Sequence, residues 1–195
     1  IPDSFAIIGM GKLGGSEINF KSDLDLIFVY EDTPNDSLFS GDIVLFYTKI
    51  SQLLHELTSE ITSSGYVYKI DSDLRPEGKS GRMVNSIKSY EGYYKTRART
   101  WEQQAMVRAR FIAGNQQTGE NFINMVKNFT YRSKLEYESI IDISRLREKI
   151  EKDLAGETAN EKNVKLGYGG LMDIEFATQI LQMIHGKKDH QLMST

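Results

Sequence analysis

The chain has 195 residues, a formal net charge of −3 and no cysteine. The missing cysteine excludes disulfide bonds and thiolate metal sites, and the small negative charge gives no electrostatic case for binding nucleic acid or an anionic membrane. A chain of this length forms one or two domains with a substantial core. Because we find neither an apolar run of membrane-spanning length nor a signal-peptide pattern, we expect a cytoplasmic protein without membrane or nucleic-acid partners.

The two ends of the chain resemble cut points. The first residue is Ile1 rather than methionine, and a hydrophobic strand begins almost at once. The last residues directly follow a predicted helix. We therefore expect a piece of a longer protein, truncated at its C-terminus.

The first part of the chain combines strands with one amphipathic helix. Residues 5–9 read as a short apolar strand before a glycine-rich turn, and residues 23–30 as a second strand. Apolar residues then recur at helical spacing over 43–61. Alternation over 66–75 predicts a third strand. We expect residues 1–85 to form an α+β core.

The remaining residues, 86–195, have a helical pattern. An apolar stripe from Ala98 to Ile112 predicts a helix with Trp101 in the core. Further helices are predicted over 117–130, 137–155 and about 172–186, the last after a glycine-rich loop. The layout predicts an α+β fold followed by a helical region.

Two aspartates at the start of the second strand give the first sign of chemistry. Successive side chains of a strand alternate between faces, so Asp23 and Asp25 point the same way. The opposite face carries Leu24, Leu26 and Phe28. Two like charges at the root of a buried strand repel each other and lose hydration, and a divalent cation would neutralise them. The alternative is that the pair begins an exposed strand.

The glycine-rich turn matches a dinucleotide-binding pattern, but its spacing argues against that fold. Gly9-Met-Gly11-Lys-Leu-Gly14 fits G-x-G-x-x-G directly after a strand. A crossover helix of roughly ten or more residues must follow in that fold, whereas only eight residues separate Gly14 from Asp23. The turn also lacks the Gly-Lys-Ser/Thr ending of a Walker A loop. We take the dinucleotide match as accidental.

The spacing fits a nucleotidyltransferase better. There a short glycine-containing turn precedes a strand with Asp-x-Asp, and a later strand supplies a third carboxylate. Here ten residues separate Gly11-Lys12 from Asp23, and Asp71 on the third predicted strand is able to face the pair. Backbone N–H groups from Gly14 to Ser16 would cradle a triphosphate, because glycine permits close backbone approach.

Three carboxylates, Asp23, Asp25 and Asp71, are the predicted catalytic and metal-binding residues. Together with phosphate oxygens and water they suit Mg²⁺. Two such ions would activate the attacking oxygen and offset charge on the leaving pyrophosphate. The alternative for Asp71 is a salt bridge to Arg75 or Lys69.

Several residues near these carboxylates are candidates for binding the phosphates of a nucleotide. Lys12 lies beside the glycine turn, and an arginine such as Arg75 binds phosphate oxygens in a bidentate manner. Three other charged residues, Glu102, Arg108 and Arg110, either line a cleft between the two halves or are solvated. The predicted nucleotide-binding residues are Gly11, Lys12, Gly14, Gly15, Ser16, Ser22 and Arg75.

Four blocks of the sequence, in order, resemble the glutamine synthetase adenylyltransferase family, whose members are bifunctional adenylylating and deadenylylating enzymes. The blocks are residues 5–30 (FAIIGMGKLGGSEINFKSDLDLIFVY), 67–76 (VYKIDSDLRP), 100–110 (TWEQQAMVRAR) and 165–176 (KLGYGGLMDIEF). The resemblance implies a polymerase-β-like nucleotidyltransferase domain with a short mixed sheet, followed by a helical domain. It also implies that this chain is a fragment, since the family's enzymes carry two such halves and a regulatory region.

The resemblance further implies a function. One half of such an enzyme transfers AMP from ATP to a tyrosine of glutamine synthetase, and the other removes it by phosphorolysis, releasing ADP. By position, Asp23 and Asp25 match the metal-binding pair and Asp71 the third carboxylate. The implied partners are ATP, glutamine synthetase and, through regions absent here, the PII signal protein. One departure is Asp73, where the family usually has arginine; it either adds a fourth ligand or pairs with Arg75.

The direction of transfer rests on smaller similarities. Residues 172–176 and 100–105 look more like the adenylylating half, whereas Asn19 looks more like the other half. We favour adenylylation, with Asp71 as the base for an attacking tyrosyl oxygen. Deadenylylation by the same site and a non-catalytic nucleotide-binding regulatory module are the alternatives. Asp173 either supports the start of the last helix or takes part in catalysis.

Overall fold

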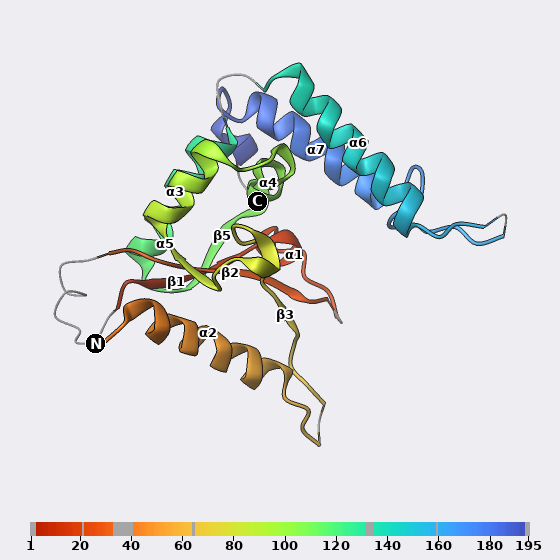
Figure 1. The fold of residues 1–195 in the computed structure, drawn as a ribbon. Coiled ribbons are helices and arrows are strands. Elements are labelled where there is room, and N and C mark those ends of the chain that lie inside the picture. The colour runs from red at the N-terminus through yellow and green to blue at the C-terminus, as the bar shows by residue number, and fades with distance from the viewer. Residues whose placement is uncertain are drawn as a thin grey trace. The chain divides into compact units, whose positions relative to one another are not determined.

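The computed structural model describes residues 3–20, 22–32, 41–63, 65–131, 135–158 and 160–193. Its contacts divide the chain into two compact units (Figure 1). The sheet unit consists of Ile1–Ala98 and Arg108–Val126, and the helical unit of Arg99–Val107 and Lys127–Ser194. The domain boundary expected between residues 85 and 86 stays a proposal.

A mixed five-stranded sheet forms the centre of the sheet unit. Its strands are β1 (Phe5–Gly9), β2 (Leu24–Tyr30), β3 (Ile70–Asp71), β4 (Val84–Ser86) and β5 (Arg110–Gly114). The order is β3-β2-β1-β5, and β4 also pairs with β2. Strand β1 is antiparallel to β2 and β5, whereas β2 is parallel to β3 and β4. This sheet, with the helices that follow it, confirms the predicted α+β fold.

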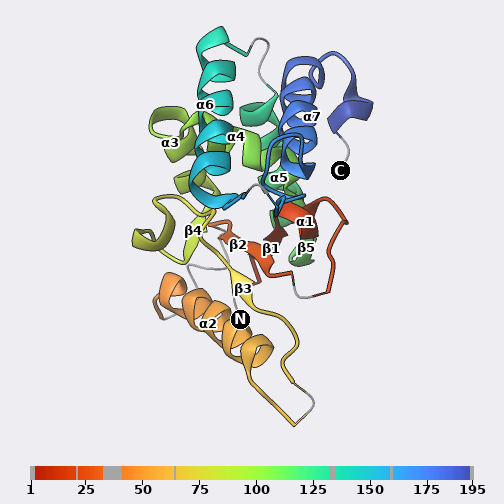
Figure 2. The ribbon, with the colours of Figure 1, turned by 90° about the vertical axis from the view of Figure 1, so that its right-hand side faces the viewer.

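Helix α2 (Ile43–Ser59) covers one face of the sheet, as Figure 2 shows. Its first turn is capped by Asp42, whose carboxylate accepts the N–H groups of Val44 and Leu45 at 2.9 and 3.1 Å. The core beneath it contains Leu26, Phe28, Tyr30, Tyr47 and Val84, with Leu24 packed against them. The predicted alternation along the second strand is therefore confirmed, and Asp25 lies on the face away from α2.

Two helices complete the sheet unit beyond β4. Helix α3 (Ile87–Thr96) begins at Ser86, whose hydroxyl accepts the N–H of Ser89 at 3.2 Å. Helix α5 (Gln116–Thr130) contacts it through Phe122, whose ring packs edge-on against Tyr90 with centroids 5.0 Å apart. Burial raises the pKa of the Tyr90 hydroxyl far above its ordinary value.

The helix predicted over 98–112 is present only in its first part, as helix α4 (Thr100–Ala105). A single 3₁₀ turn (Met106–Arg108) and strand β5 take the place of the rest. Strand β5 pairs with β1. Without β5, β1 would be an edge strand with unpaired backbone N–H and C=O groups. Trp101 is 37% exposed, so its expected core position is also wrong. A short apolar run fits helix and strand equally, and a distant partner decides between them.

The third predicted strand is shorter than expected. Only Ile70 and Asp71 join the sheet, while Tyr66 and Val67 remain exposed. A strand of two residues is too short to show an alternating pattern, and its length depends on how far the partner strand continues the hydrogen-bond ladder. The one-turn helix α1 (Gly11–Gly14) within the glycine-rich turn was not predicted either.

The helical unit is organised around α6 (Tyr137–Leu154) and α7 (Leu171–His185). Val107, Ile143 and Met183 form its core, with Phe176 and Ile180 packed against them. Together with α5, these helices confirm the three predicted after residue 115. No helix in the described part of the chain has the length and apolar character needed to cross a membrane.

A buried arginine ties the second glycine-rich loop to helix α7. The Arg147 guanidinium donates to the Gly167 carbonyl at 2.9 Å and forms an ion pair with Asp173 at 2.5 Å. Asp173 also accepts the N–H of Gly169 at 2.7 Å. A buried cation requires such partners, so Asp173 supports the start of α7.

Arg147→Ala should destabilise the helical unit. Because the change leaves Asp173 without its cation, the free energy of unfolding should fall by about 2 kcal/mol. Urea unfolding followed by fluorescence of the single tryptophan, Trp101 in this unit, measures the change. The control is Arg145→Ala, since that side chain is 74% exposed and its pair with Asp142 spans 3.7 Å. Equal midpoints for the two variants would contradict the role given to Arg147.

Candidate functional site

The parallel pairing of β2 with β3 brings two of the predicted carboxylates together. Asp25 and Asp71 are register partners, next to the pair Leu24 and Ile70. Leu24 and Ile70 both pack into the core beneath α2. The two aspartates therefore lie side by side on the opposite face of the sheet. Asp23 is exposed and directly precedes β2.

Carboxylate oxygens such as these are the type of ligand that Mg²⁺ prefers. In the described residues no three His, Cys, Asp or Glu side chains are arranged to hold a metal, so Asp23 does not complete a group with the other two. Mg²⁺ keeps several waters and is commonly bound by one or two carboxylates plus substrate phosphates. Asp25 and Asp71 supply that minimal set. Asp71 is also oriented from outside the sheet, because its Oδ1 accepts the N–H of Asp73 at 2.8 Å.

The glycine-rich turn lies directly against Asp25. The carbonyl of Asp25 accepts the N–H of Met10 at 2.8 Å, which ties the start of the turn to β2. Gly11 has φ of 50°, and a methyl group on its Cα would overlap the Asp25 carboxylate. Only glycine combines this backbone angle with so close an approach. The turn and the carboxylate thus form one local unit.

The amides expected to cradle phosphate are already paired within the turn. The N–H groups of Gly14, Gly15 and Ser16 donate to the carbonyls of Met10, Gly11 and Leu13 at 2.8, 3.0 and 3.2 Å. The open cradle that we expected from the sequence is therefore not the conformation seen here. The turn instead presents the exposed Ser16, at φ of 58°, and the half-buried Lys12.

Arg75 is held within the loop that follows β3. Its guanidinium donates to the Ser72 carbonyl at 2.7 Å, to the Ser72 hydroxyl at 3.1 Å and to the Gly81 carbonyl at 3.3 Å. Asp73 pairs with Arg75 at 3.5 Å and with Lys79 at 3.4 Å. Asp73 thus takes the ion-pair alternative, while a phosphate contact from Arg75 stays a prediction.

His55 is not among the predicted site residues, although it interacts electrostatically with Asp71 and Arg75. It lies on α2, with its ring tilted against Phe28 at a centroid distance of 6.0 Å. Burial lowers the pKa of His55, the positive charge of Arg75 lowers it further, and Asp71 opposes both. The sequence pattern predicts only that this histidine lies on a helix, so it gives no sign of these interactions.

Two arginines of the sheet unit also contact the glycine turn. Arg110 donates to the carbonyls of Leu13 and Gly14, and Arg108 pairs with Glu17. The sequence predicted for both arginines either a cleft position or a solvated face. It did not indicate these contacts, because more than ninety residues separate each pair. The third member of that group, Glu102, instead accepts the N–H of Arg99 at 2.8 Å and so caps α4.

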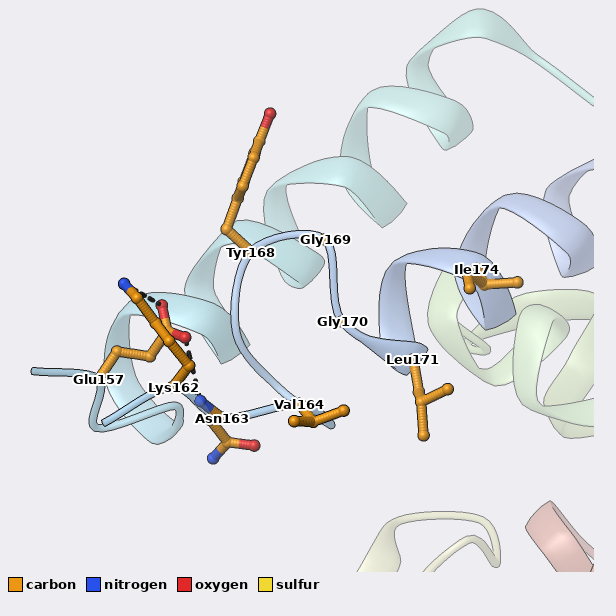
Figure 3. Close-up of a pocket in the computed structure, with 9 residues that line it drawn as sticks. All are labelled: Glu157, Lys162, Asn163, Val164, Tyr168, Gly169, Gly170, Leu171 and Ile174. Carbon is orange, nitrogen blue, oxygen red and sulfur yellow. Dashed lines mark hydrogen bonds and ion pairs between the residues drawn. The ribbon is translucent and has the colours of Figure 1, made fainter. Parts of the chain in front are cut away.

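A separate pocket of about 440 Å³ lies within the helical unit (Figure 3). The loop before α7 and the first turn of that helix form its walls, and Lys162 pairs with Glu157 at its edge. Its lining residues are Glu157, Lys162, Asn163, Val164, Tyr168, Gly169, Gly170, Leu171 and Ile174. None of the predicted catalytic or nucleotide-binding residues contributes to it.

Comparison with known proteins agrees with the sequence blocks. The chain is 38% identical over 193 residues to the bifunctional glutamine synthetase adenylyltransferase/adenylyl-removing enzyme of Pseudomonas aeruginosa, which covers 98% of this chain and 20% of that protein. The enzyme of the same name from Methylococcus capsulatus is 38% identical over 190 residues, or 97% of this chain and 20% of that protein. That from Streptomyces avermitilis is 36% identical over 189 residues, or 97% and 19%. The chain spans about a fifth of the length of these relatives.

Two family models divide the chain between them. The model for GlnD PII-uridylyltransferase matches residues 143–194, within the helical unit. The model for glutamate-ammonia ligase adenylyltransferase matches residues 1–125, which include the whole sheet, the glycine turn and all three aspartates. The resemblance inferred from the sequence blocks is thereby confirmed, and the chain belongs to the glutamate-ammonia ligase adenylyltransferase family.

Proposed function

We propose that the sheet unit transfers AMP from ATP to a tyrosine of glutamine synthetase. The observation that carries the proposal is the pairing of Asp25 with Asp71 beside the glycine turn, in a chain of this family. A pair of carboxylates next to a glycine turn suits a reaction at a phosphorus atom. In such chemistry the protein acts mainly by positioning and by stabilising charge.

In the proposed reaction, the tyrosyl oxygen attacks the α-phosphorus of ATP in line with the leaving group. The new O–P bond forms as the bond between the α- and β-phosphates breaks, and pyrophosphate leaves. Asp71 takes the tyrosyl proton; it is exposed and so accessible to a protein substrate, and its contact with the Asp73 amide orients it.

The same carboxylates would hold Mg²⁺. Asp25 and Asp71 supply the minimal ligand set, and Asp23 is the third residue assigned to it from the sequence. A bound ion supplies charge neutralisation for the phosphates. Lys12 and Ser16 are the side chains of the turn that we assign to the phosphates, with Ser22 close to Asp23 in sequence. Gly11 lets the turn lie against Asp25, and Gly14 and Gly15 are the other glycines of the turn assigned to the nucleotide from the sequence.

Deadenylylation is the second candidate, because one residue favours it. Asn19 looks more like the deadenylylating half, whereas residues 172–176 look more like the adenylylating half. In that reaction inorganic phosphate attacks the phosphorus of AMP–tyrosine, the bond between that phosphorus and the tyrosyl oxygen breaks, and ADP and a protonated tyrosine are the products. The relatives' name includes both activities, so the family does not decide the direction. PII as a regulator and a cytoplasmic setting belong to the same proposal.

Asp25→Asn should abolish transfer. The amide keeps the size of the side chain but loses the charge that would bind the metal, so labelling of glutamine synthetase by α-labelled ATP should fall about 100-fold or more. Asp32→Asn is the matched control, since Asp32 is exposed just beyond β2. Normal turnover by Asp25→Asn would remove this aspartate from the mechanism.

Supplying each substrate in turn decides the direction. With glutamine synthetase and α-labelled ATP, we expect label on the protein and release of pyrophosphate. With adenylylated glutamine synthetase and phosphate, we expect little ADP. The opposite pattern would assign the chain to deadenylylation. If neither assay gave product and calorimetry detected no Mg²⁺-dependent binding of ATP, a non-catalytic module would be favoured.

Gly11→Ala should weaken Mg²⁺-dependent ATP binding, because the added methyl group displaces the Asp25 carboxylate. We expect the dissociation constant measured by calorimetry to rise about tenfold or more, the equivalent of about 1.4 kcal/mol. Gly156→Ala provides the control: its φ of 58° imposes similar backbone strain, and an added Cβ would meet nothing within 4 Å. Equal binding by both variants would contradict the close contact between turn and carboxylate.

A further inference from the structure

Strand β5 and the 3₁₀ turn before it contact the glycine turn through two arginines that the proposed reaction does not use. We propose that Arg110 is a positioning residue, which holds the turn of residues 9–17 in the conformation needed for nucleotide transfer. The inference rests on the function proposed for this turn. It assigns a role to a residue that lies about a hundred positions away from the turn in sequence.

The guanidinium of Arg110 satisfies the end of the one-turn helix α1. Its Nε donates to the Gly14 carbonyl at 2.9 Å, and its Nη2 donates to the Leu13 carbonyl at 2.6 Å. The last carbonyls of a helix lack partners within the helix and carry its negative end, which a cation stabilises. A helix of four residues does not form unaided, because nucleation is unfavourable. The turn therefore depends on this external support.

Arg108 supports the turn at a second place. Its side chain, 18% exposed, forms an ion pair with Glu17 at 2.5 Å. Its carbonyl lies so close to Gly14 that a methyl group on this glycine would overlap it. Between these contacts, Ser16 adopts a left-handed φ of 58°, which a residue other than glycine rarely holds without help. The backbone and both arginines of this segment thus define the path of the turn.

The opposite side of the turn rests on β2. Asp25 contacts Gly11, and the Asp25 carbonyl accepts the Met10 N–H. Gly9, where the turn begins, is register partner of Leu26 on β2 and of Arg110 on β5. The β1–β5 register shifts between Ile7 and Ile8, a local irregularity of the kind that re-aims side chains near active sites. Because the turn is held between Arg110 and Asp25, releasing Arg110 would shift the turn, and Lys12 with it, relative to Asp25.

The test combines kinetics with amide hydrogen exchange on the chain. Arg110→Met removes every donor, and Arg110→Lys keeps the charge but lacks the fork that reaches two carbonyls. We expect Arg110→Met to lower kcat/KM for ATP about 100-fold, and Arg110→Lys to lie between it and wild type, because a small displacement of reacting groups has effects of that size. Exchange should accelerate at residues 10–17 while β1 and β2 keep their protection.

Two further variants separate this inference from the proposed function. Arg97→Met alters an exposed arginine of the same unit, 65% accessible and paired with Glu77, and should change neither measurement. Asp25→Asn should be inactive with protected amides in the turn. If Asp25→Asn stays active, the proposed function fails, while the exchange data still decide whether Arg110 holds the turn.

Two results would overturn the role of Arg110. One is wild-type kcat/KM in Arg110→Met when Asp25→Asn is inactive. The other is faster exchange throughout β1 and β2, with equal losses in Arg110→Met and Arg110→Lys, which would show general destabilisation rather than positioning. Should Arg110→Met fail to fold, Arg110→Lys alone decides: faster exchange confined to 10–17 supports the role, and unchanged exchange contradicts it.

Discussion

The parallel pairing of β2 with β3 is the constraint on which the candidate site depends. Strand β3 contributes only two residues to the sheet, yet they place Asp71 opposite Asp25 and Ile70 opposite Leu24. The side chains of Leu24 and Ile70 pack into the core beneath α2 and hold the two strands together. Burial of this kind stabilises by about 25 cal/mol per Å² of apolar surface. The hydrophobic face thereby holds two like charges side by side on the other face. That repulsion is what a bound cation would relieve.

The glycine turn is fitted to this pair from both sides. On one side Gly11 allows the Asp25 carboxylate to lie against the backbone, and on the other Arg110 binds the carbonyls that end α1. Neither contact is local in sequence. A segment from the beginning of the chain, one aspartate of β2 and an arginine of β5 therefore act as a single structural unit.

The sequence predicted much of this fold, and the failures have a common cause. Strands 5–9 and 23–30, helix 43–61 and the later helices follow from periodicity, because each buries a face of its own. Strand β5 and the two-residue β3 owe their existence to distant partners, so the stretch around residues 98–112 was read as one helix. The carboxylates Asp25 and Asp71 were predicted from spacing and resemblance, and the structure places them together. The contacts of Arg110 had no local signal, and the paired amides of Gly14 to Ser16 depend on a helical turn too short to show a pattern.

Paramagnetic broadening by Mn²⁺, used in place of Mg²⁺, tests most directly whether Asp25 and Asp71 form one metal–nucleotide site. With an ATP analogue that cannot react, NMR spectra of the chain should lose the amide signals of Gly11, Lys12, Asp25 and Asp71 first. Signals of Phe5 and Tyr30, which pair at the other end of β1 and β2 in the same unit, should broaden last. Broadening at Phe5 and Tyr30 first, or none at Asp25 and Asp71, would contradict the account.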